Sequence, residues 1–282
     1  MKFLTYRSGD GRFRPGVLEG DLIRTIATPT LRDYLELAPH ERVAWHTADE
    51  LVELQSVTLD APVRPSRNVF CVGRNYLEHA REGARAAGRE LKLPSVPTFF
   101  TKAPTAIAGP GDDLCLEARV SKEYDFEAEL AVVIGAECKN VPEDEALHVV
   151  FGYTALNDVT ARDLQREHGQ WFKGKSLDAT CPIGPWIVTP DELGDPQALA
   201  ITLHRNGVEK QNSNTGEMIF SVARVIAELS KGMTLLPGDI IATGTPEGVG
   251  FARTPAEFLA DGDVLEIWIE KIGHLLNAVT IA

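Results

Sequence analysis

Three carboxylates recur at every second position in the stretch from residue 122 to 135. Asp125, Glu127 and Glu129 fall on one side of a predicted strand, and apolar residues fall on the other. Like charges at this spacing repel, and carboxylates beside a Val-Val-Ile run are poorly solvated. A hard divalent cation resolves both problems, because Mg²⁺ and Mn²⁺ bind carboxylate oxygens. An edge strand with a hydrated acidic face explains the same spacing, so both interpretations stay open on spacing alone.

A further carboxylate follows the apolar run 149–156, which we predict to be a second strand. Asp158 lies just past its end, where ligands are often found. Together with Glu127 and Glu129 it would supply three oxygen ligands, a common way to hold Mg²⁺ or Mn²⁺.

A possible acid–base pair lies in a predicted helix that begins near residue 74. His79 and Glu82 are three residues apart and therefore neighbours on one helix face. They suit a general base and the carboxylate that orients it, although a helix-surface pair without function has the same spacing. The glycine-rich loop 244–250 lacks the ending of a nucleotide-binding loop, but could present backbone N–H groups to a carboxylate.

The composition restricts the class of protein and its partners. The chain has 282 residues, of which 44% are hydrophobic and 24% charged, as is typical of a soluble globular protein. Its formal net charge of −13 makes nucleic acid and anionic membranes poor partners. No signal peptide and no apolar run of membrane-spanning length is found, so we expect a cytoplasmic protein. The unpatterned spacing of four cysteines predicts buried, reduced thiols.

The elements that must position these residues divide into two predicted domains. Residues 1–62 predict a small N-terminal α+β domain, with strands before residue 27 and a polar helix from Thr30 to about Leu54. A proline-containing linker leads to the domain 67–282, in which strands and hairpins outnumber helices. This favours an α+β fold over a doubly wound parallel sheet. Residues 83–96 are small and charged, which suggests a loosely held lid.

Five motifs in chain order make the domain 67–282 resemble the fumarylacetoacetate hydrolase family, and in particular its bacterial members that act on acylpyruvates. They are Gly73-Arg74-Asn75-Tyr76 with His79 and Glu82, Phe126-Glu127-Ala128-Glu129-Leu130, Asn157 to Asp163, Gly174-Lys175-Ser176 followed by Cys181 to Pro185, and Thr243-Gly244-Thr245-Pro246 followed by Gly248-Val249-Gly250. Each motif alone is weak, whereas all five in order are specific.

The resemblance implies a mixed β-sandwich roll with flanking helices, usually assembled as a homodimer. It implies Mg²⁺, or Mn²⁺, held by Glu127, Glu129 and Asp158. It makes His79 and Glu82 the catalytic pair, on a helix that orders over bound ligand, and it matches Lys175 to the active-site lysine. Five further residues match positions that contact a small anionic 2-oxo acid substrate in relatives: Arg74, Lys102, Arg162, Gln165 and Thr245.

The expected reaction is cleavage of an acylpyruvate, a 2-oxo acid with a second carbonyl at C4, to pyruvate and a carboxylic acid. His79, oriented by Glu82, would activate a water for attack on C4, while the metal and Lys175 would stabilise negative charge at the 2-oxo oxygen. The same site also suits oxaloacetate tautomerisation or decarboxylation, hydroxymuconate isomerisation or decarboxylation, and sugar-acid dehydration. A non-catalytic ligand-binding module is a remote alternative.

Overall fold

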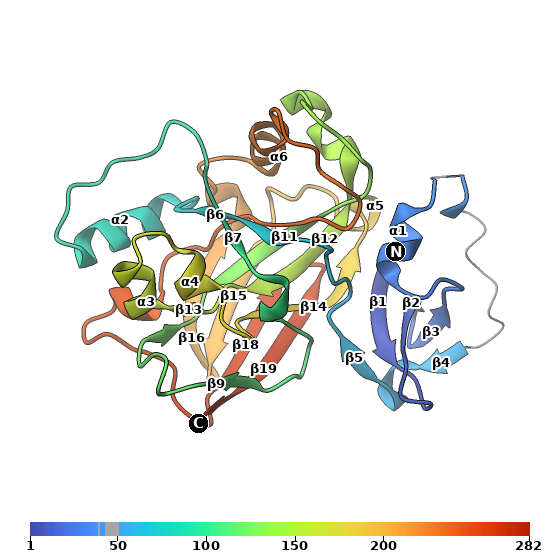
Figure 1. Ribbon diagram of the computed structural model, residues 1–282, viewed down its shortest axis with the longest axis horizontal. Coiled ribbons are helices and arrows are strands. Elements are labelled where there is room, and N and C mark those ends of the chain that lie inside the picture. Colours follow the sequence, from blue (N-terminus) through green and yellow to red (C-terminus); the bar gives the residue numbers. More distant parts are fainter. Residues whose placement is uncertain (39, 43–50) are drawn as a thin grey trace.

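The fold is a sandwich of two β-sheets with short helices around it (Figure 1). The structure is a computed structural model that describes residues 1–38, 40–42 and 51–282. Within these residues one sheet has twelve strands and a second has five. Strands β10 (Tyr124–Asp125) and β13 (Thr160–Ala161) form a separate two-stranded sheet. The predicted α+β class and mixed β-sandwich roll are confirmed.

The large sheet contains parallel and antiparallel pairs and spans the whole molecule. Its main path, in spatial order, is β4 (Leu51–Glu53), β3 (Leu22–Thr25), β2 (Phe13–Glu19), β1 (Lys2–Arg7), β14 (Cys181–Val188), β12 (Val150–Asn157), β11 (Ala128–Ile134), β17 (Ile240–Ala242), β6 (Val69–Gly73) and β7 (Thr98–Lys102). Off this path, β5 (Thr58–Asp60) pairs with β1 and β8 (Ile107–Ala108) pairs with β14.

The second sheet closes the sandwich. Its order is β16 (Val208–Asn214), β15 (Ala200–Arg205), β18 (Val264–Ile269), β19 (Gly273–Ile281) and β9 (Leu114–Leu116). The α-helices are α1 (Leu31–Glu36), α2 (Leu77–Ala86), α3 (Arg162–Glu167), α4 (Phe172–Lys175), α5 (Pro190–Leu193) and α6 (Val222–Ser230). Short 3₁₀ turns are η2 (Leu54–Ser56), η3 (Pro104–Ala106), η4 (Glu143–Val149), η5 (Thr215–Glu217) and η6 (Gly250–Ala252). No helix of the described residues is long and apolar enough to cross a membrane.

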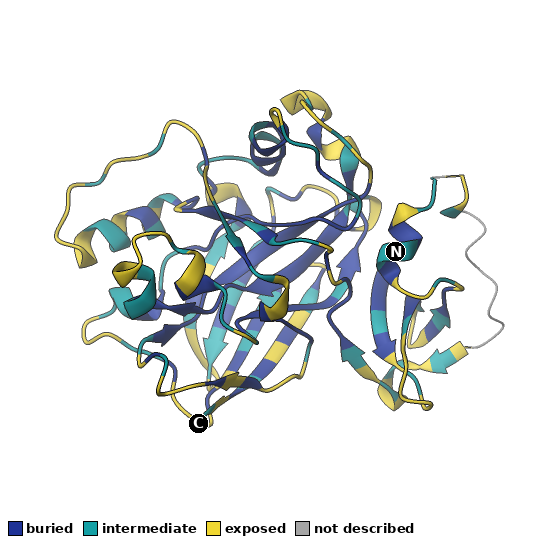
Figure 2. Cartoon of the chain, viewed as in Figure 1, coloured by how far each residue is buried: buried dark blue, intermediate teal, exposed yellow. Residues whose placement is uncertain are grey.

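The core lies between the two sheets and on the outer side of the central strands. All seven residues of β11 are buried, because sheet or helix covers both of its faces (Figure 2). Leu130 and Val132 pack in the cluster between the sheets, whereas Ala131 and Val133 pack in a second cluster with Phe3 of the N-terminal strand. A strand buried on both faces offers little water to any carboxylate that it carries.

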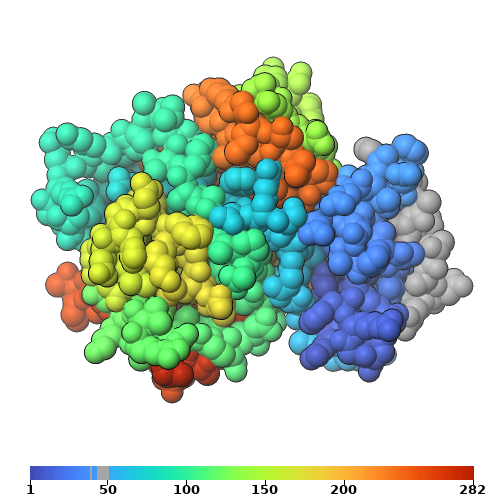
Figure 3. Space-filling view, viewed as in Figure 1, coloured from blue at the N-terminus to red at the C-terminus, as the bar shows by residue number. Residues whose placement is uncertain are grey.

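The N-terminal segment extends the large sheet and forms a lobe at one side of the molecule (Figures 1 and 3). Strand β1 pairs antiparallel with β14, with Lys2 opposite Val188 and Phe3 opposite Ile187. The Arg42 guanidinium also donates to the Gly135 carbonyl at 2.8 Å. The domain boundary at residues 62–67 stays a prediction, and the lobe is joined to the rest of the chain by main-chain pairing.

Several predicted elements are confirmed and others are wrong. The hairpin at Asn206 and Gly207 is present between β15 and β16, and both residues have positive φ, as a two-residue hairpin turn requires. The helix predicted from Thr30 to Leu54 is wrong at its end, because Leu51–Glu53 pairs with β3 as a strand; residues 39 and 43–50 lie outside the described part. Helix α6 begins at Val222 after the cap Ser221, whereas Asn214 caps the short turn η5 by accepting from the Gly216 N–H.

The cysteine prediction is correct for pairing and only partly correct for burial. The structure has four free thiols, of which Cys71 and Cys181 are buried, Cys138 is half-buried and Cys115 is exposed.

Candidate active site

Glu127, Glu129 and Asp158 meet at a break in the acidic stretch. The predicted single strand is two strands, β10 and β11, separated by residues 126 and 127. Asn157 accepts a hydrogen bond from the Glu127 N–H at 3.0 Å, and the Glu127 carbonyl accepts from the Asp158 N–H at 2.9 Å. These bonds bring the three side chains together, and each offers an oxygen within 4.8 Å of the others.

All three carboxylates are buried, with exposed fractions of 4%, 1% and 0% in the order Glu127, Glu129, Asp158. The interpretation of this stretch as an edge strand with a hydrated acidic face is therefore wrong. Asp125, which shares the same sequence alternation, points elsewhere: it accepts from the Arg162 Nε at 2.8 Å and from three backbone N–H groups.

Three buried cations hold this cluster. Lys175 Nζ donates to Glu127 at 2.8 Å and to Asp158 at 2.7 Å. Lys102 Nζ donates to the other Asp158 oxygen at 2.7 Å and to the Val159 carbonyl at 3.1 Å. The Arg162 Nη2 lies 2.7 Å from Glu127. Each lysine comes from a different element, since Lys102 ends β7 and Lys175 ends α4.

The charges in the cluster do not cancel. Among the described residues, four carboxylates (Asp125, Glu127, Glu129 and Asp158) face three cations (Lys102, Arg162 and Lys175), which leaves one negative charge. Burial opposes ionisation of Glu127, but Lys175 and Arg162 outweigh it and lower the Glu127 pKa to about 2. Burial, together with the negative charges of Asp158 and Glu127, raises the pKa of Glu129 well above its usual range.

The uncompensated charge fits a divalent cation. Glu129 has one backbone donor, the Gly244 N–H at 2.7 Å, and no side-chain cation bonded to it in the described part of the chain. A dication bound by Glu127, Glu129 and Asp158 would offset the remaining charge, and three carboxylate oxygens are a donor set that Mg²⁺ and Mn²⁺ accept. The residues present therefore fit the metal that the resemblance implies.

The glycine-rich loop presents its N–H groups to the protein's own carboxylates. Gly244 donates to Glu129 at 2.7 Å, Gly248 to Glu82 at 2.9 Å, and Gly250 and Phe251 to Asp125 at 2.7 and 3.1 Å. At Gly248 only glycine suits the backbone, because φ is +101° and a Cβ would lie 2.1 Å from the Lys210 carbonyl oxygen. The loop thus fixes carboxylates from three separate elements, whereas the sequence indicated only a carboxylate-binding turn.

His79 and Glu82 form the predicted pair on α2. His79 Nδ1 lies 2.9 Å from Glu82 Oε1, and their side chains are only 12% and 13% exposed. Glu82 Oε2 accepts from the Gly248 N–H, so both carboxylate oxygens are engaged. With the Nδ1 proton donated to Glu82, Nε2 keeps a free lone pair, which is the state a general base needs. The pair and the carboxylate cluster are held by the same glycine-rich loop, because Gly248 donates to Glu82 and Gly244 donates to Glu129.

The remaining predicted residues lie at different distances from the cluster. Gln165 accepts from the Arg162 Nη1 at 3.2 Å. Thr245 is buried and accepts from the amide of Gln211 at 2.8 Å. Arg74 is exposed, has a positive φ of 58° and stacks its guanidinium 5.3 Å from the ring centre of Trp171, without a described bond to the cluster. The roles of these residues as substrate contacts stay predictions.

Gln211 is a member of the site that sequence reasoning missed. It is buried, accepts from the Ala128 N–H at 2.9 Å and donates to Thr245 and to the Pro246 carbonyl at 2.8 Å each. It thereby joins β16 to β11 and to the glycine-rich loop. The polar run around it is typical of an exposed strand, so the sequence carried no signal for this role.

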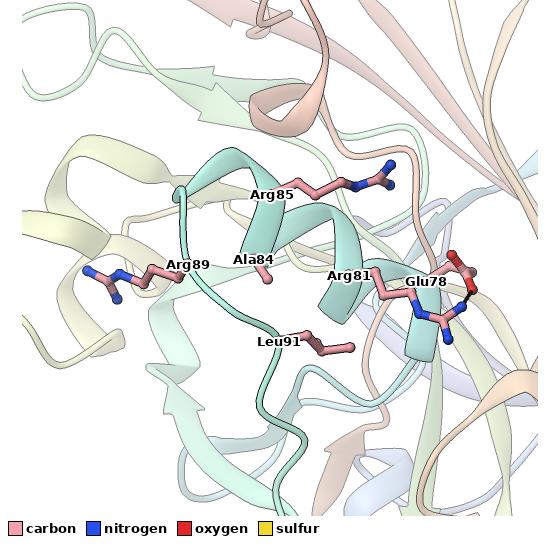
Figure 4. Close-up of a pocket in the computed structure, with 6 residues that line it drawn as sticks. All are labelled: Glu78, Arg81, Ala84, Arg85, Arg89 and Leu91. Carbon is pink, nitrogen blue, oxygen red and sulfur yellow. Dashed lines mark hydrogen bonds and ion pairs between the residues drawn. The ribbon is translucent and has the colours of Figure 1, made fainter.

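A surface pocket on α2 lies away from the chemistry. It has a volume of about 270 Å³ and is bounded by α2 and the segment after it. Figure 4 shows that the guanidinium groups of Arg85 and Arg89 point away from each other, while Arg81 turns to Glu78. The helical spacing puts this surface on a different side of α2 from His79 and Glu82. The buried carboxylate cluster is therefore our candidate active site.

Comparison with known proteins identifies the family. The family model described as fumarylacetoacetate (FAA) hydrolase C-terminal matches residues 68–280. The chain belongs to the fumarylacetoacetate hydrolase family, whose relatives found here include hydrolases and a tautomerase.

Two curated relatives and one solved structure are informative. The chain is 46% identical over 230 residues to oxaloacetate tautomerase YisK of Bacillus subtilis, covering 81% of this chain and 75% of the relative. It is 40% identical over 282 residues to the 2,4-didehydro-3-deoxy-L-rhamnonate hydrolase of a Sphingomonas species, covering 97% and 94%. The structure of a fumarylacetoacetate hydrolase from Exiguobacterium antarcticum matches over 100% of both chains, with 40% identity and a TM-score of 0.86.

Proposed function

We propose that this protein hydrolyses the C3–C4 bond of a 2,4-dioxo acid, releasing pyruvate and a carboxylic acid. The observation that carries the proposal is the His79–Glu82 pair beside the carboxylate cluster, with both Glu82 oxygens engaged. An enzyme that only moves a proton on an already acidic C3 has less need of a base oriented for water.

The proposed reaction converts R–CO–CH₂–CO–COO⁻ and one water into R–COO⁻, pyruvate and one proton. His79 Nε2 takes a proton as the water oxygen bonds to C4, and Glu82 stabilises the imidazolium that forms. The C3–C4 bond then breaks, its electron pair moves toward C3 and the 2-oxo oxygen, and the imidazolium returns its proton to C3. Lys175 fixes Glu127 and Asp158 through its hydrogen bonds, and it places positive charge in a buried site where that charge acts strongly.

The metal ligands in this proposal are Glu127, Glu129 and Asp158. When bound there, Mg²⁺ or Mn²⁺ would polarise the carboxylate and 2-oxo group of the substrate as a Lewis acid. Lys102 orients Asp158, to which it donates together with the Val159 carbonyl. Arg162 orients Glu127, and its other described bonds go to Asp125 and Gln165.

The Sphingomonas hydrolase supports the hydrolytic form of the proposal. Its name describes a substrate that is a sugar acid with carbonyls at C2 and C4, and the match includes the N-terminal segment. The Bacillus tautomerase favours a second candidate, the interconversion of oxaloacetate tautomers, which needs no activated water.

A substrate comparison with Mg²⁺ separates the two candidates. Acetylpyruvate, a sugar-derived 2,4-dioxo acid and oxaloacetate are each incubated with the protein, and pyruvate release and enol absorbance are followed. We expect pyruvate from at least one 2,4-dioxo acid. Rapid loss of the oxaloacetate enol with no cleavage of any 2,4-dioxo acid would favour the tautomerase and contradict hydrolysis.

A further inference from the structure

Arg253 closes a chain of hydrogen bonds that ends at the His79–Glu82 pair. Its guanidinium donates to the Gly248 carbonyl from Nε at 3.1 Å and from Nη2 at 3.0 Å. The N–H of the same glycine donates to Glu82, which in turn lies 2.9 Å from His79. Rotation of the Gly248 backbone would therefore move both the donor to Glu82 and the acceptor of Arg253.

A β-bulge supplies the second anchor of this arginine. The β15–β16 ladder shifts register between Leu203 and His204, so that Lys210 has no partner in the register. The Lys210 carbonyl instead accepts from Arg253 Nη2 at 2.6 Å. A bulge frees main-chain groups from the ladder and is often found next to active sites. Here it provides the acceptor that holds the arginine over Gly248.

Gly248 has little freedom to relax in this arrangement. Its φ of +101° and the 2.1 Å approach that a Cβ would make to the Lys210 oxygen show that the loop lies directly against the bulge. Phe251 in η6, near the far end of the loop, lies 3.9 Å from where a Cβ on Gly83 of α2 would be. The loop is thus the surface on which α2 rests, and Arg253 ties that surface to the second sheet.

We propose that Arg253 is a positioning residue that sets the orientation and tautomer of His79 through Gly248 and Glu82. The expected change in kcat rests on the proposed function. The expected change in the orientation and tautomer of the His79 imidazole does not depend on it. A single guanidinium can satisfy two carbonyls at once because its donors are arranged in a fixed fork, whereas an ammonium is a point charge on a flexible stem. Arg253→Lys should therefore restore the brace only in part.

The test compares Arg253→Ala and Arg253→Lys with the control Arg224→Ala in the full-length protein with Mg²⁺. Arg224 is a partly exposed arginine on α6 whose described ion pairs go to the exposed Glu143 and to Glu228 on the same helix. We expect Arg253→Ala to lower kcat on the cleaved 2,4-dioxo acid by roughly 10–100-fold with KM changed little, since small misplacements of catalytic groups have effects of this size. The kcat of Arg253→Lys should lie between those of the parent and Arg253→Ala, and the kcat of Arg224→Ala should equal that of the parent. Added guanidinium should recover part of the rate lost in Arg253→Ala.

The ¹⁵N spectrum of the His79 ring provides a readout independent of activity. The signal is assigned by its absence in His79→Gln, and we expect the Nδ1–H tautomer in the parent and a mixture in Arg253→Ala. A folded Arg253→Ala with the parent tautomer and kcat would overturn the inference, as would a lower thermal stability with an unchanged spectrum. A shifted tautomer in a protein that cleaves no 2,4-dioxo acid would instead uphold the positioning role and contradict the proposed function. If Arg253→Ala does not fold, Arg253→Lys takes the same two tests.

Discussion

Glu82→Gln should abolish the proposed hydrolysis because it forces His79 into the wrong tautomer. Glu82 now accepts two hydrogen bonds, one from Gly248 N–H and one from His79 Nδ1–H. The substituted amide has only one oxygen. A backbone N–H can only donate, so the amide oxygen must turn to Gly248 and the NH₂ group to Nδ1. Nδ1 then has to accept, the ring proton moves to Nε2, and the lone pair needed to activate water is lost.

The size of the effect follows from the chemistry of oriented histidines. General-base catalysis contributes roughly 10²–10⁴-fold, and a wrong tautomer in an otherwise intact site has cost about 10⁴ in a serine protease. We expect a loss of about 10³–10⁴ in kcat for 2,4-dioxo acid cleavage, or about 4–5.5 kcal/mol of transition-state stabilisation. The alternative amide orientation would set two donors against each other and leave a nearly buried N–H unsatisfied, at a cost of about 1–3 kcal/mol.

The assay follows pyruvate release by Glu82→Gln and by the matched control Glu78→Gln. Glu78 lies one turn earlier on the same helix, is half exposed and has Arg81 as its one ion-pair partner in the described part of the chain, so its substitution should leave the rate unchanged. Decarboxylation of oxaloacetate, which needs no activated water, should be much less affected by Glu82→Gln. A rate within about tenfold of the parent, or equal losses in both reactions, would refute the assignment of His79 as the base for water.

Three further predictions concern the metal site, a buried hydroxyl and the lid. Glu129 has a raised pKa in the folded protein, so its ionisation lowers the stability of the metal-free protein as pH rises above about 4.5. Glu129→Gln should therefore raise the melting temperature of the metal-free protein at pH 7. Glu127→Gln should lower that temperature, because it removes a carboxylate of lowered pKa that is paired with Lys175 and Arg162. A higher melting temperature for Glu127→Gln than for Glu129→Gln would contradict the charge count. Both variants, like Asp158→Ala, should lose Mg²⁺-dependent stabilisation and activity, and full activity after exhaustive chelation would refute the metal requirement. The buried hydroxyl of Tyr76 has no hydrogen-bond partner among the described residues. Tyr76→Phe should therefore leave the free energy of unfolding of the metal-free protein, measured by denaturant titration, equal or higher. A decrease of more than about 1 kcal/mol in that free energy would reveal a partner. Finally, hydrogen exchange at residues 80–95 should slow when oxalate and Mg²⁺ are added, and strong protection in both states would count against a lid.

The buried carboxylate cluster was predictable because its signal is local. Glu127 and Glu129 stand at i and i+2 beside an apolar run, and that pattern survives the break in the strand that alternation did not reveal. His79 and Glu82 were likewise predictable from helical spacing. In both groups the residues lie near one another in the chain. Asp158 is more distant in sequence, but it was predictable because it follows directly after a buried strand.

The bonds that orient these residues were not predictable, because they depend on tertiary contacts. Gly248 and Glu82 are 166 residues apart, and Lys102 and Asp158 are 56 apart. Gln211 lies in a run of polar residues that is typical of an exposed strand, and only the packing of β16 against β11 buries it. The helix predicted to Leu54 failed for the same reason: the pairing of Leu51–Glu53 with β3 prevailed over a weak local pattern.

The central claim is that a water molecule adds to C4 and the C3–C4 bond breaks. The most direct test incubates the Mg²⁺-loaded protein with acetylpyruvate in H₂¹⁸O and analyses the acetate by mass spectrometry. Hydrolysis assisted by His79 predicts acetate that carries one ¹⁸O atom, formed at the rate of pyruvate release and absent in Glu82→Gln. The central claim would be contradicted if the acetylpyruvate stayed intact while the same protein rapidly converted the oxaloacetate enol.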